Sequence, residues 1–397
     1  MDSGEPGILQ SILRDHWPQV ESMLCDRLPE PVASAVRDGV RKALRCRTEA
    51  NGYARYRCAD CGASHTVCFT CKSRLCPACG RARAAEAAAN ARSRLLSVNH
   101  RHLTFSVPSE LRALLYAHRE LLNVVARAAA QATLQAVGTR CRAHAPLPGV
   151  MATVHTFGRD LSWHVHVHVL CTEGGLRADG VWQPVHNFPW RQCRKLWQHF
   201  LLEGLRRALK GNRSLQWKIG RLYRTHPTGF IANVVSHYTN GEMAAAYCCR
   251  YTGRPPLSER RIVAYDGEQV TLAYKDYRDG LDKTLTLPAA DFLLRVMQHV
   301  WPRYQRDVHY YGLYQPSRRK QHAAAVVQAS RYHEQVLPKP ALSRRERLEA
   351  AMAGLDLRCP ACGGPLVFEC LELPRERHAS KGRPRTKGNR AQLCLRM

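Results

Sequence analysis

Three histidines alternate with three valines in the middle of the chain, between His164 and Val169. A period of two is typical of a β-strand, in which successive side chains point to opposite faces. The valines would then face a hydrophobic core, and the imidazoles would share the other face. Imidazoles two residues apart on one face lie within about 7 Å of each other, near enough to bind one metal ion together. The run through His164, His166 and His168 therefore predicts a strand with a metal-binding or catalytic role.

Two tyrosines, Tyr247 and Tyr251, lie four residues apart in a segment predicted to be helical. At this spacing their Cβ atoms lie about 6 Å apart on one helical face. A phenolic oxygen can act as a nucleophile in covalent catalysis. Tyrosine pairs at helical spacing are also ordinary core residues. The pair gains significance only in combination with the histidines.

Cysteines with zinc-ligand spacing lie in two regions of the sequence. Two Cys-x-x-Cys-Gly knuckles give the four-ligand set that we expect first, Cys58, Cys61, Cys76 and Cys79. Further candidates for ligand substitution or a second zinc ion are Cys46, Cys68, Cys71 and His65. A third knuckle, at Cys359 and Cys362, predicts a candidate carboxy-terminal zinc site. A closed set of four ligands leaves no open position, so we expect zinc to be structural.

The chain is strongly basic, with 60 Lys and Arg residues against 32 Asp and Glu residues and a net charge of +28. This excess favours a polyanionic partner, nucleic acid first.

No apolar stretch approaches the roughly 18 to 20 residues that span a bilayer, and no long basic amphipathic helix favours a membrane surface. Residues 1–6 lack a signal-peptide core, and cysteines in metal-type pairs favour a reducing compartment. We therefore expect a cytoplasmic protein.

The elements that must position these residues alternate between helix and strand. Hydrophobic periodicity and turn residues predict helices over 8–45, 80–96, 109–137, 190–210, 242–250 and 288–300, and strands over 102–107, 149–157, 163–170, 230–235, 261–265 and 269–274. This order predicts an α+β fold. We expect a helical and zinc-binding domain over 1–96 and a catalytic domain over 97–317. A basic, partly disordered region with the third knuckle would follow over 318–397.

As an ordered set, these motifs resemble the two-tyrosine HUH transposases of rolling-circle insertion sequences. The likeness covers about residues 40–316. It rests on the zinc-binding region followed by Thr156-Phe157-Gly158-Arg159-Asp160, His166-Val167-His168, Thr172-Glu173-Gly174-Gly175, Tyr247-x-x-x-Tyr251-Thr252 and Tyr310-Tyr311-Gly312-Leu313-Tyr314.

The resemblance implies an antiparallel, ferredoxin-like nuclease core and a metal-dependent endonuclease acting on single-stranded DNA. His166 and His168 would bind Mg²⁺ or Mn²⁺, with His155, Asp160 and His164 as candidates for a further ligand. Tyr247 or Tyr251 would attack a phosphate and form a 5′-phosphotyrosine link. The partners would be insertion-sequence ends and target DNA in a bacterial cell, in association with the nucleoid.

Two other interpretations remain open at this point. A plasmid relaxase or replication initiator would use the same histidine and tyrosine chemistry on an origin. A zinc-dependent DNA-binding protein without catalysis would need the histidines and tyrosines only for structure. The sequence contains no Gly-Lys-Thr/Ser phosphate loop, so a fused helicase is not expected. It does not predict an oligomeric state.

Overall fold

The computed structural model describes residues 7–73, 75–140, 145–185, 190–239, 243–244, 246–247, 251–253, 255–276, 279–329 and 358–373. Most of the helix predicted over 242–250 and all of the basic tail after residue 373 lie outside these ranges. The predicted domain boundaries remain predictions.

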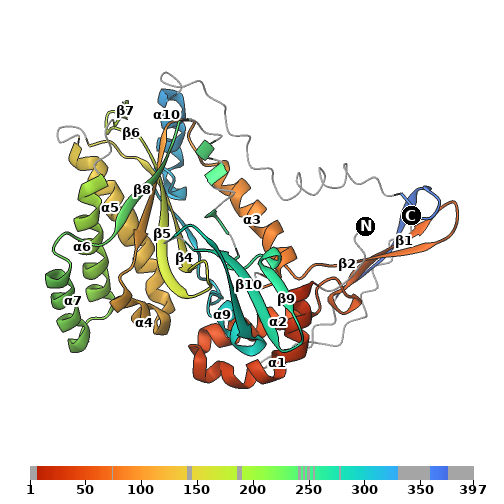
Figure 1. The fold of residues 1–397 in the computed structure, drawn as a ribbon. Coiled ribbons are helices and arrows are strands. Elements are labelled where there is room, and N and C mark those ends of the chain that lie inside the picture. Colours follow the sequence, from red (N-terminus) through yellow and green to blue (C-terminus); the bar gives the residue numbers. More distant parts are fainter. Residues whose placement is uncertain are drawn as a thin grey trace, which may run out of the picture.

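A five-stranded antiparallel sheet is the centre of the fold (Figure 1). Its order is β12-β4-β5-β3-β8. Along the chain, β3, β4, β5 and β8 form a β-α-β-β-α-β unit whose spatial order 8-3-5-4 is that of a ferredoxin-like sheet. The predicted α+β class and antiparallel core are therefore confirmed. The strands are β3 (His100–Ser106), β4 (Gly149–Phe157), β5 (Trp163–Thr172), β8 (Ala232–Tyr238) and β12 (Val308–Gly312).

Four helices cover one face of this sheet: α4 (Ser109–Ala117), α5 (Leu122–Arg140), α6 (Trp190–Ala208) and α7 (Arg213–Thr225). The sequence pattern predicted one helix over 109–137, but the chain turns at His118, where ψ is 79°. A buried arginine explains the break. Arg119 Nε donates a hydrogen bond to the carbonyl of Tyr116, and its guanidinium lies 3.9 Å from the ring centre of Trp163.

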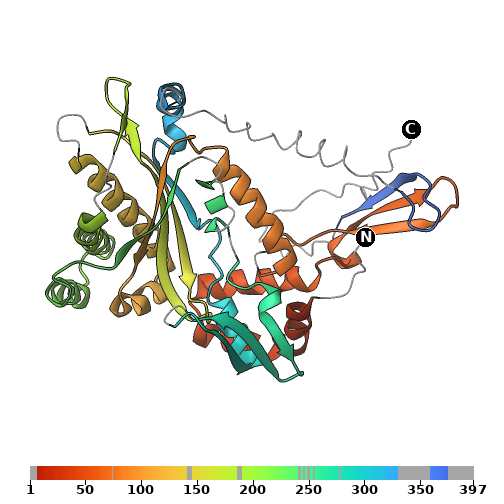
Figure 2. The same cartoon turned by 45° about the horizontal axis from the view of Figure 1, so that its top comes forward.

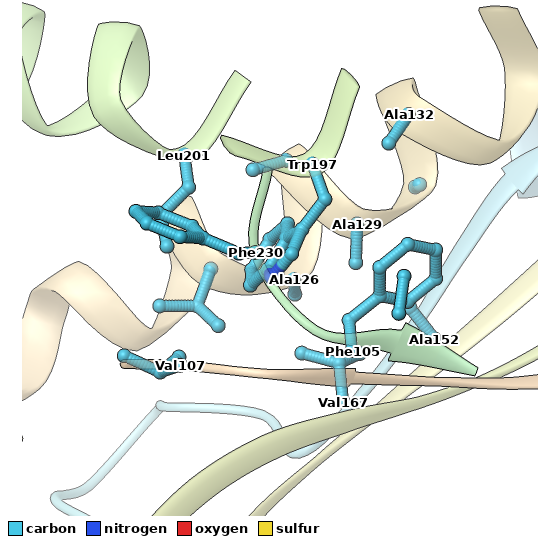
Figure 3. Packing of buried hydrophobic residues seen from close by; sticks show 14 of the residues in the cluster. Phe105, Val107, Ala126, Ala129, Ala132, Ala152, Val167, Trp197, Leu201 and Phe230 are labelled. Atoms are coloured by element: carbon cyan, nitrogen blue, oxygen red, sulfur yellow. The ribbon is translucent and has the colours of Figure 1, made fainter. Parts of the chain in front are cut away.

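The core between sheet and helices receives the valine face of β5. Val165, Val167 and Val169 are fully buried, as their alternation with histidine predicted. Phe105, the neighbour of Val167 on β3, and Trp197 from α6 pack in the same core (Figure 3). The rings of Phe105 and Trp197 lie 5.4 Å apart, and Trp197 donates its indole N–H to a strand carbonyl. The strand is thus fixed in register by burial on one face.

The other face of the sheet lies under α3 (Pro77–Arg92), which is on the opposite side from α5 and α6 (Figure 2). Alanines Ala88 and Ala91 are buried on α3 and share a cluster with Met151, Leu170 and Tyr247. Helix α10 (Arg319–Ala329) contributes Ala325 and Ala329 to the same cluster. Ordered structure therefore continues beyond residue 318, where the sequence pattern predicted that it fades.

A second core joins the amino-terminal helices to a small sheet. Helices α1 (Ile8–Arg27) and α2 (Glu30–Leu44) pack with α9 (Ala289–Met297) and with the antiparallel sheet β11-β10-β9 (Figure 1). The predicted helices and hairpin are confirmed. The strands are β9 (Ile262–Tyr265), β10 (Gln269–Lys275) and β11 (Asp282–Pro288).

Two further sheets were absent from the predicted elements. Strands β6 (Gly174–Leu176) and β7 (Trp182–Pro184) form a short hairpin, so Gly174 and Gly175 begin a new strand after β5 ends. A three-stranded sheet, β13-β1-β2, combines β1 (Tyr53–Cys58) and β2 (Ser64–Cys68) with β13 (Leu366–Glu372) from the other end of the chain. None of the helices in the described part of the chain combines the length and the apolarity that a bilayer crossing requires.

Replacing Gly149 with alanine should destabilise the fold. A Cβ atom at this position would lie 2.7 Å from the ring of Tyr314. That ring cannot retreat easily, because its hydroxyl accepts a hydrogen bond from the backbone N–H of Leu96 and lies 2.6 Å from Nε2 of His100. Overpacking of this kind costs about 1–3 kcal/mol. Gly138→Ala, in α5, is the matched control, since its nearest neighbour would be an ordinary 3.8 Å away. Urea unfolding should show a lower midpoint for Gly149→Ala only; equal midpoints would contradict the packing argument.

Candidate active site and metal centres

Three histidines meet on the face of the sheet opposite the valine core. His166 and His168 project from β5, and His155 projects from β4, where it is the cross-strand partner of His166. One ring nitrogen of each residue lies within 4.8 Å of the others. The structure therefore brings the two predicted ligands together and adds His155, one of the three candidates for a further ligand.

Hydrogen bonds leave one nitrogen of each β5 imidazole directed toward this group. Nδ1 of His166 lies 3.1 Å from the carbonyl of His164, and Nδ1 of His168 lies 3.0 Å from Nε2 of His102. Such contacts fix the ring orientation and tautomer of a metal-binding histidine. His102, on β3, was not among the sequence candidates. It is fully buried, and only the pairing of β3 with β5 places it beside His168.

Burial favours the neutral form of His166 and His164. Loss of solvation lowers the pKa of His166 to about 3, and repulsion from His155 and His164 acts in the same direction. Burial also lowers the pKa of His164, with a further contribution from Arg112. A neutral imidazole is the form that binds a metal ion. The site is therefore ready to accept a cation at neutral pH without first releasing a proton from His166.

Both tyrosines approach the histidines. The ring centre of Tyr251 lies 4.2 Å from that of His168 and 4.9 Å from that of Tyr247. Tyr247 is almost completely buried, at 1% exposure, and contacts His102 at 4.8 Å between ring centres. The structure therefore places both tyrosines beside the histidine group.

Helix α3 confines the turn that follows Tyr251. Gly253 has a φ of +64°, and a Cβ atom there would lie 2.9 Å from Cβ of Ala87. The turn therefore needs glycine both for its backbone conformation and for the close approach of the helix. The backbone carbonyl of Tyr251 lies 3.0 Å from Nε2 of His155, which joins the same turn to the histidine group.

Two other predicted residues lie outside the trio. His164 is next to His166, with 5.3 Å between ring centres, but is not part of the three-nitrogen group. Asp160 stabilises the turn between β4 and β5, where its carboxylate accepts hydrogen bonds from the backbone N–H and the hydroxyl of Ser162.

The three grouped residues offer only nitrogen donors, which suit a transition-metal ion such as Mn²⁺ better than Mg²⁺.

The cysteines form two groups, and the grouping differs from the set expected first. Cys76 and Cys79 group with Cys46 and Cys71 at the start of α3, with neighbouring sulfurs 3.5 to 3.7 Å apart. A tetrahedral site with Zn–S bonds near 2.3 Å has edges of about 3.8 Å, so these cysteines fit zinc. A hydrogen bond from the thiol of Cys71 is the largest cause that lowers the pKa of Cys76, to about 5. This favours a thiolate at neutral pH.

The other knuckle of the expected set, Cys58 and Cys61, lies elsewhere. The hairpin of β1 and β2 carries it away from α3 and places it against the carboxy-terminal pair Cys359 and Cys362. His65 lies beside this second group, with Nε2 at 3.2 Å from Sγ of Cys359. Cys68, at the end of β2, belongs to neither group.

Comparison with known proteins gives two family matches and two relatives. A family described as "Putative transposase" matches residues 149–322, and one described as "Transposase zinc-binding domain" matches residues 12–107. The transposase for insertion sequence element IS801 of Pseudomonas savastanoi pv. phaseolicola is 28% identical over 355 residues, covering 83% of this chain and 82% of the relative. The "Putative transposase y4qJ" of Sinorhizobium fredii is 27% identical over 339 residues, covering 80% and 84%.

No solved structure matches the chain significantly. The first family match contains the histidine strand and both tyrosines, and the second contains the cysteine group at the start of α3. These matches support an insertion-sequence transposase of the IS91 type, with an N-terminal zinc-binding domain.

Proposed function

We propose that this transposase cuts and rejoins single-stranded DNA at insertion-sequence ends through a covalent 5′-phosphotyrosine intermediate, as in rolling-circle transposition. The observation that carries the proposal is the contact between a phenol and the histidine group. Tyr251 lies 4.2 Å from His168 between ring centres, and His168 is one of three imidazoles able to share an ion. A nucleophile and a cation site are thus side by side.

Tyr251 is the better placed of the two nucleophiles. Its side chain is partly exposed, whereas Tyr247 is 1% exposed and lies behind it, toward His102. A phosphate can therefore reach Tyr251 without displacement of the covering residues. We assign the first cleavage to Tyr251, and a second transfer to Tyr247 after the segment that carries both residues has moved.

The cleavage step is a transesterification. The oxygen of Tyr251 attacks phosphorus in line, a P–O bond to tyrosine forms, and the P–O bond to the 3′ oxygen breaks. The phenolic proton leaves the nucleophile, and the departing oxygen takes up a proton as it becomes a 3′-hydroxyl. The number of phosphoester bonds is unchanged, so a 3′-hydroxyl can reverse the step and join DNA without ATP.

The histidines hold and orient the cation site in this scheme. His155, His166 and His168 would bind a divalent ion, which would polarise the scissile phosphate and stabilise the negative charge that develops on it. His102 acts as a positioning residue. With Nε2 of His168 facing the ion, Nδ1–H of His168 donates to Nε2 of His102, and this hydrogen bond fixes the ring.

Exposed arginines lie on the helix beside this site. Arg83 and Arg92 are exposed on α3, the helix that packs on the turn after Tyr251. With a net charge of +28, binding should rest largely on phosphate contacts and weaken with salt. The partly exposed Tyr251 supplies a ring on which an unpaired base can stack.

The two rival functions differ from this proposal in the DNA that is cut or in the absence of cutting. A relaxase or replication initiator would form the same covalent link on an origin sequence and not on insertion-sequence ends. A non-catalytic zinc protein would bind DNA and form no link. The similarity to a transposase of an insertion-sequence element over four-fifths of the chain favours the transposition reading.

Tyr251→Phe should abolish covalent attachment to DNA, because it removes the attacking oxygen and leaves the ring contacts. The assay incubates the full chain with labelled single-stranded insertion-sequence ends and Mn²⁺ and seeks a protein–DNA band that survives denaturation. Tyr247→Phe should keep the first cleavage and lose the later transfer. Tyr304→Phe, at a fully exposed tyrosine, is the matched control and should behave as the unaltered chain. A Tyr251→Phe chain that still forms the band would exclude Tyr251 as first nucleophile.

His168→Ala and His166→Ala should each lower the cleavage rate by about 10²–10³-fold, a typical loss when stabilisation of developing charge is removed. Mn²⁺ binding, measured by calorimetry on the protein without DNA, should weaken in parallel. His199→Ala, at an exposed histidine on α6, should change neither quantity. Unchanged Mn²⁺ affinity in both β5 variants would place the ion elsewhere.

His102→Ala should act through metal affinity. We expect about 10–100-fold weaker Mn²⁺ binding, with cleavage recovered at high Mn²⁺ concentration, since the ligands themselves remain. His102→Gln retains an acceptor for Nδ1–H of His168 and should restore much of the affinity. If saturating Mn²⁺ fails to recover cleavage in His102→Ala, its role is not one of positioning.

A further inference from the structure

One metal-type cluster draws its members from both ends of the chain. The knuckle Cys58–Cys61 belongs to the amino-terminal hairpin, and the knuckle Cys359–Cys362 precedes β13. Sγ of Cys58 lies 3.5 Å from Sγ of Cys362, and Sγ of Cys61 lies 3.7 Å from Sγ of Cys359. About 300 residues of sequence separate the partners of each pair. The carboxy-terminal pair lies outside both family matches, which cover 12–107 and 149–322.

The two knuckles have nearly the same backbone structure. In each, the first cysteine accepts a hydrogen bond at its carbonyl from the following glycine, Gly62 or Gly363, at 3.1 and 2.8 Å. These glycines have φ values of +72° and +75°. In each, the first cysteine also donates its N–H to a residue five positions on, at 2.8 Å. Two matched turns thus direct four thiols to a common point.

The sulfur separations fit zinc and not disulfides. They are close to the edge of about 3.8 Å expected for four thiolates around one zinc ion, and much longer than the roughly 2.05 Å of an S–S bond.

The sheet that carries this group has little hydrophobic core. Strand β13 pairs with β1 from Tyr53↔Glu372 to Cys58↔Leu366. Among the described residues, the buried cluster here comprises Cys58, Cys359 and Leu366, with Tyr56 and Ala63 partly buried against it. Hydrophobic side chains on β13, such as Val367 and Phe368, are exposed. So small a core rarely suffices for stability without a metal ion or a disulfide.

We propose that Cys58, Cys61, Cys359 and Cys362 bind a structural zinc ion that joins the two ends of the chain. The ion is distinct from the one at Cys46, Cys71, Cys76 and Cys79, so the chain holds two thiolate-bound zinc ions. The zinc-binding domain is then completed by residues 358–373, and a chain that ends before them lacks half of this site's ligands.

Titration of the metal-free full chain with Co²⁺ tests the number and composition of the sites. The readout is the thiolate-to-cobalt charge-transfer absorption, to which the histidine group contributes nothing because it has no sulfur. We expect saturation at two equivalents for the unaltered chain. Cys359→Ser and Cys58→Ser should each reduce this to one.

Combined variants separate one shared site from two half-sites. Cys58→Ser with Cys359→Ser should still saturate at one equivalent, because both residues serve the same ion. Cys46→Ser with Cys359→Ser should leave none. The matched controls Cys68→Ser and Cys370→Ser, at neighbouring cysteines outside both groups, should retain two equivalents, and so should His65→Gln.

Three outcomes would overturn the proposal: retention of two equivalents in Cys359→Ser, loss of both in the Cys58 and Cys359 double variant, or loss of one in His65→Gln. Cys359→His guards against misfolding as an explanation. Because zinc accepts imidazole in place of thiolate, this variant should bind a second equivalent with a weaker charge-transfer band. If it binds only one, Cys359 is not a ligand.

Discussion

The burial of one face of β5 is the constraint on which the rest of the molecule depends. Val165, Val167 and Val169 are each fully buried, and burying a valine contributes about 1.5–3 kcal/mol. A slip of one residue would turn these side chains toward the opposite face and expose their apolar surface, so the register is strongly determined. Because strand side chains alternate, the burial of the valines also determines the face to which His166 and His168 point. The positions of these candidate ligands are therefore a consequence of packing on the other side of the sheet.

The imidazole face of the sheet, on which His166 and His168 are half-buried, is partly covered by other elements. Helix α3 contributes to this cover with small residues, since Ala88 and Ala91 allow it to lie close to the sheet while the tyrosine segment occupies the space beside it. The same helix begins at the cysteine group of Cys46, Cys71, Cys76 and Cys79. Zinc at its start would fix the direction of the helix, and the helix confines the turn at Gly253. Helix α3 thus connects the cysteine group directly to the turn that follows the candidate catalytic residue Tyr251.

Sequence reasoning succeeded where the signal is local. The alternation in β5, the strands beside it and the amphipathic amino-terminal helices follow from periodicity within a few residues. It failed where contacts between distant segments determine the structure. Periodicity cannot reveal that the chain turns at His118, because that turn depends on Arg119 reaching Trp163. His102 and His155 join the site through strand pairing, so the first was missed and the second was one of three candidates. The approach of Tyr251 to His168 likewise depends on how α3 and the sheet pack.

The cysteines show why spacing alone cannot assign ligands. The three Cys-x-x-Cys-Gly knuckles are chemically alike, and Cys46 and Cys71 offer further thiols, so many four-ligand sets satisfy the same pattern. The choice is made by backbone pairing. Strand β1 pairs with β13 and so places Cys58 and Cys61 beside the carboxy-terminal knuckle. Cys76 and Cys79 group instead with Cys46 and Cys71 at the start of α3. Zinc binding stabilises only the strand pairing that brings four thiolates together. Metal binding and the long-range pairing of β1 with β13 therefore stabilise each other. A contact between chain ends about 300 residues apart is slow to form and entropically costly, and a metal ion is a means of making it persist.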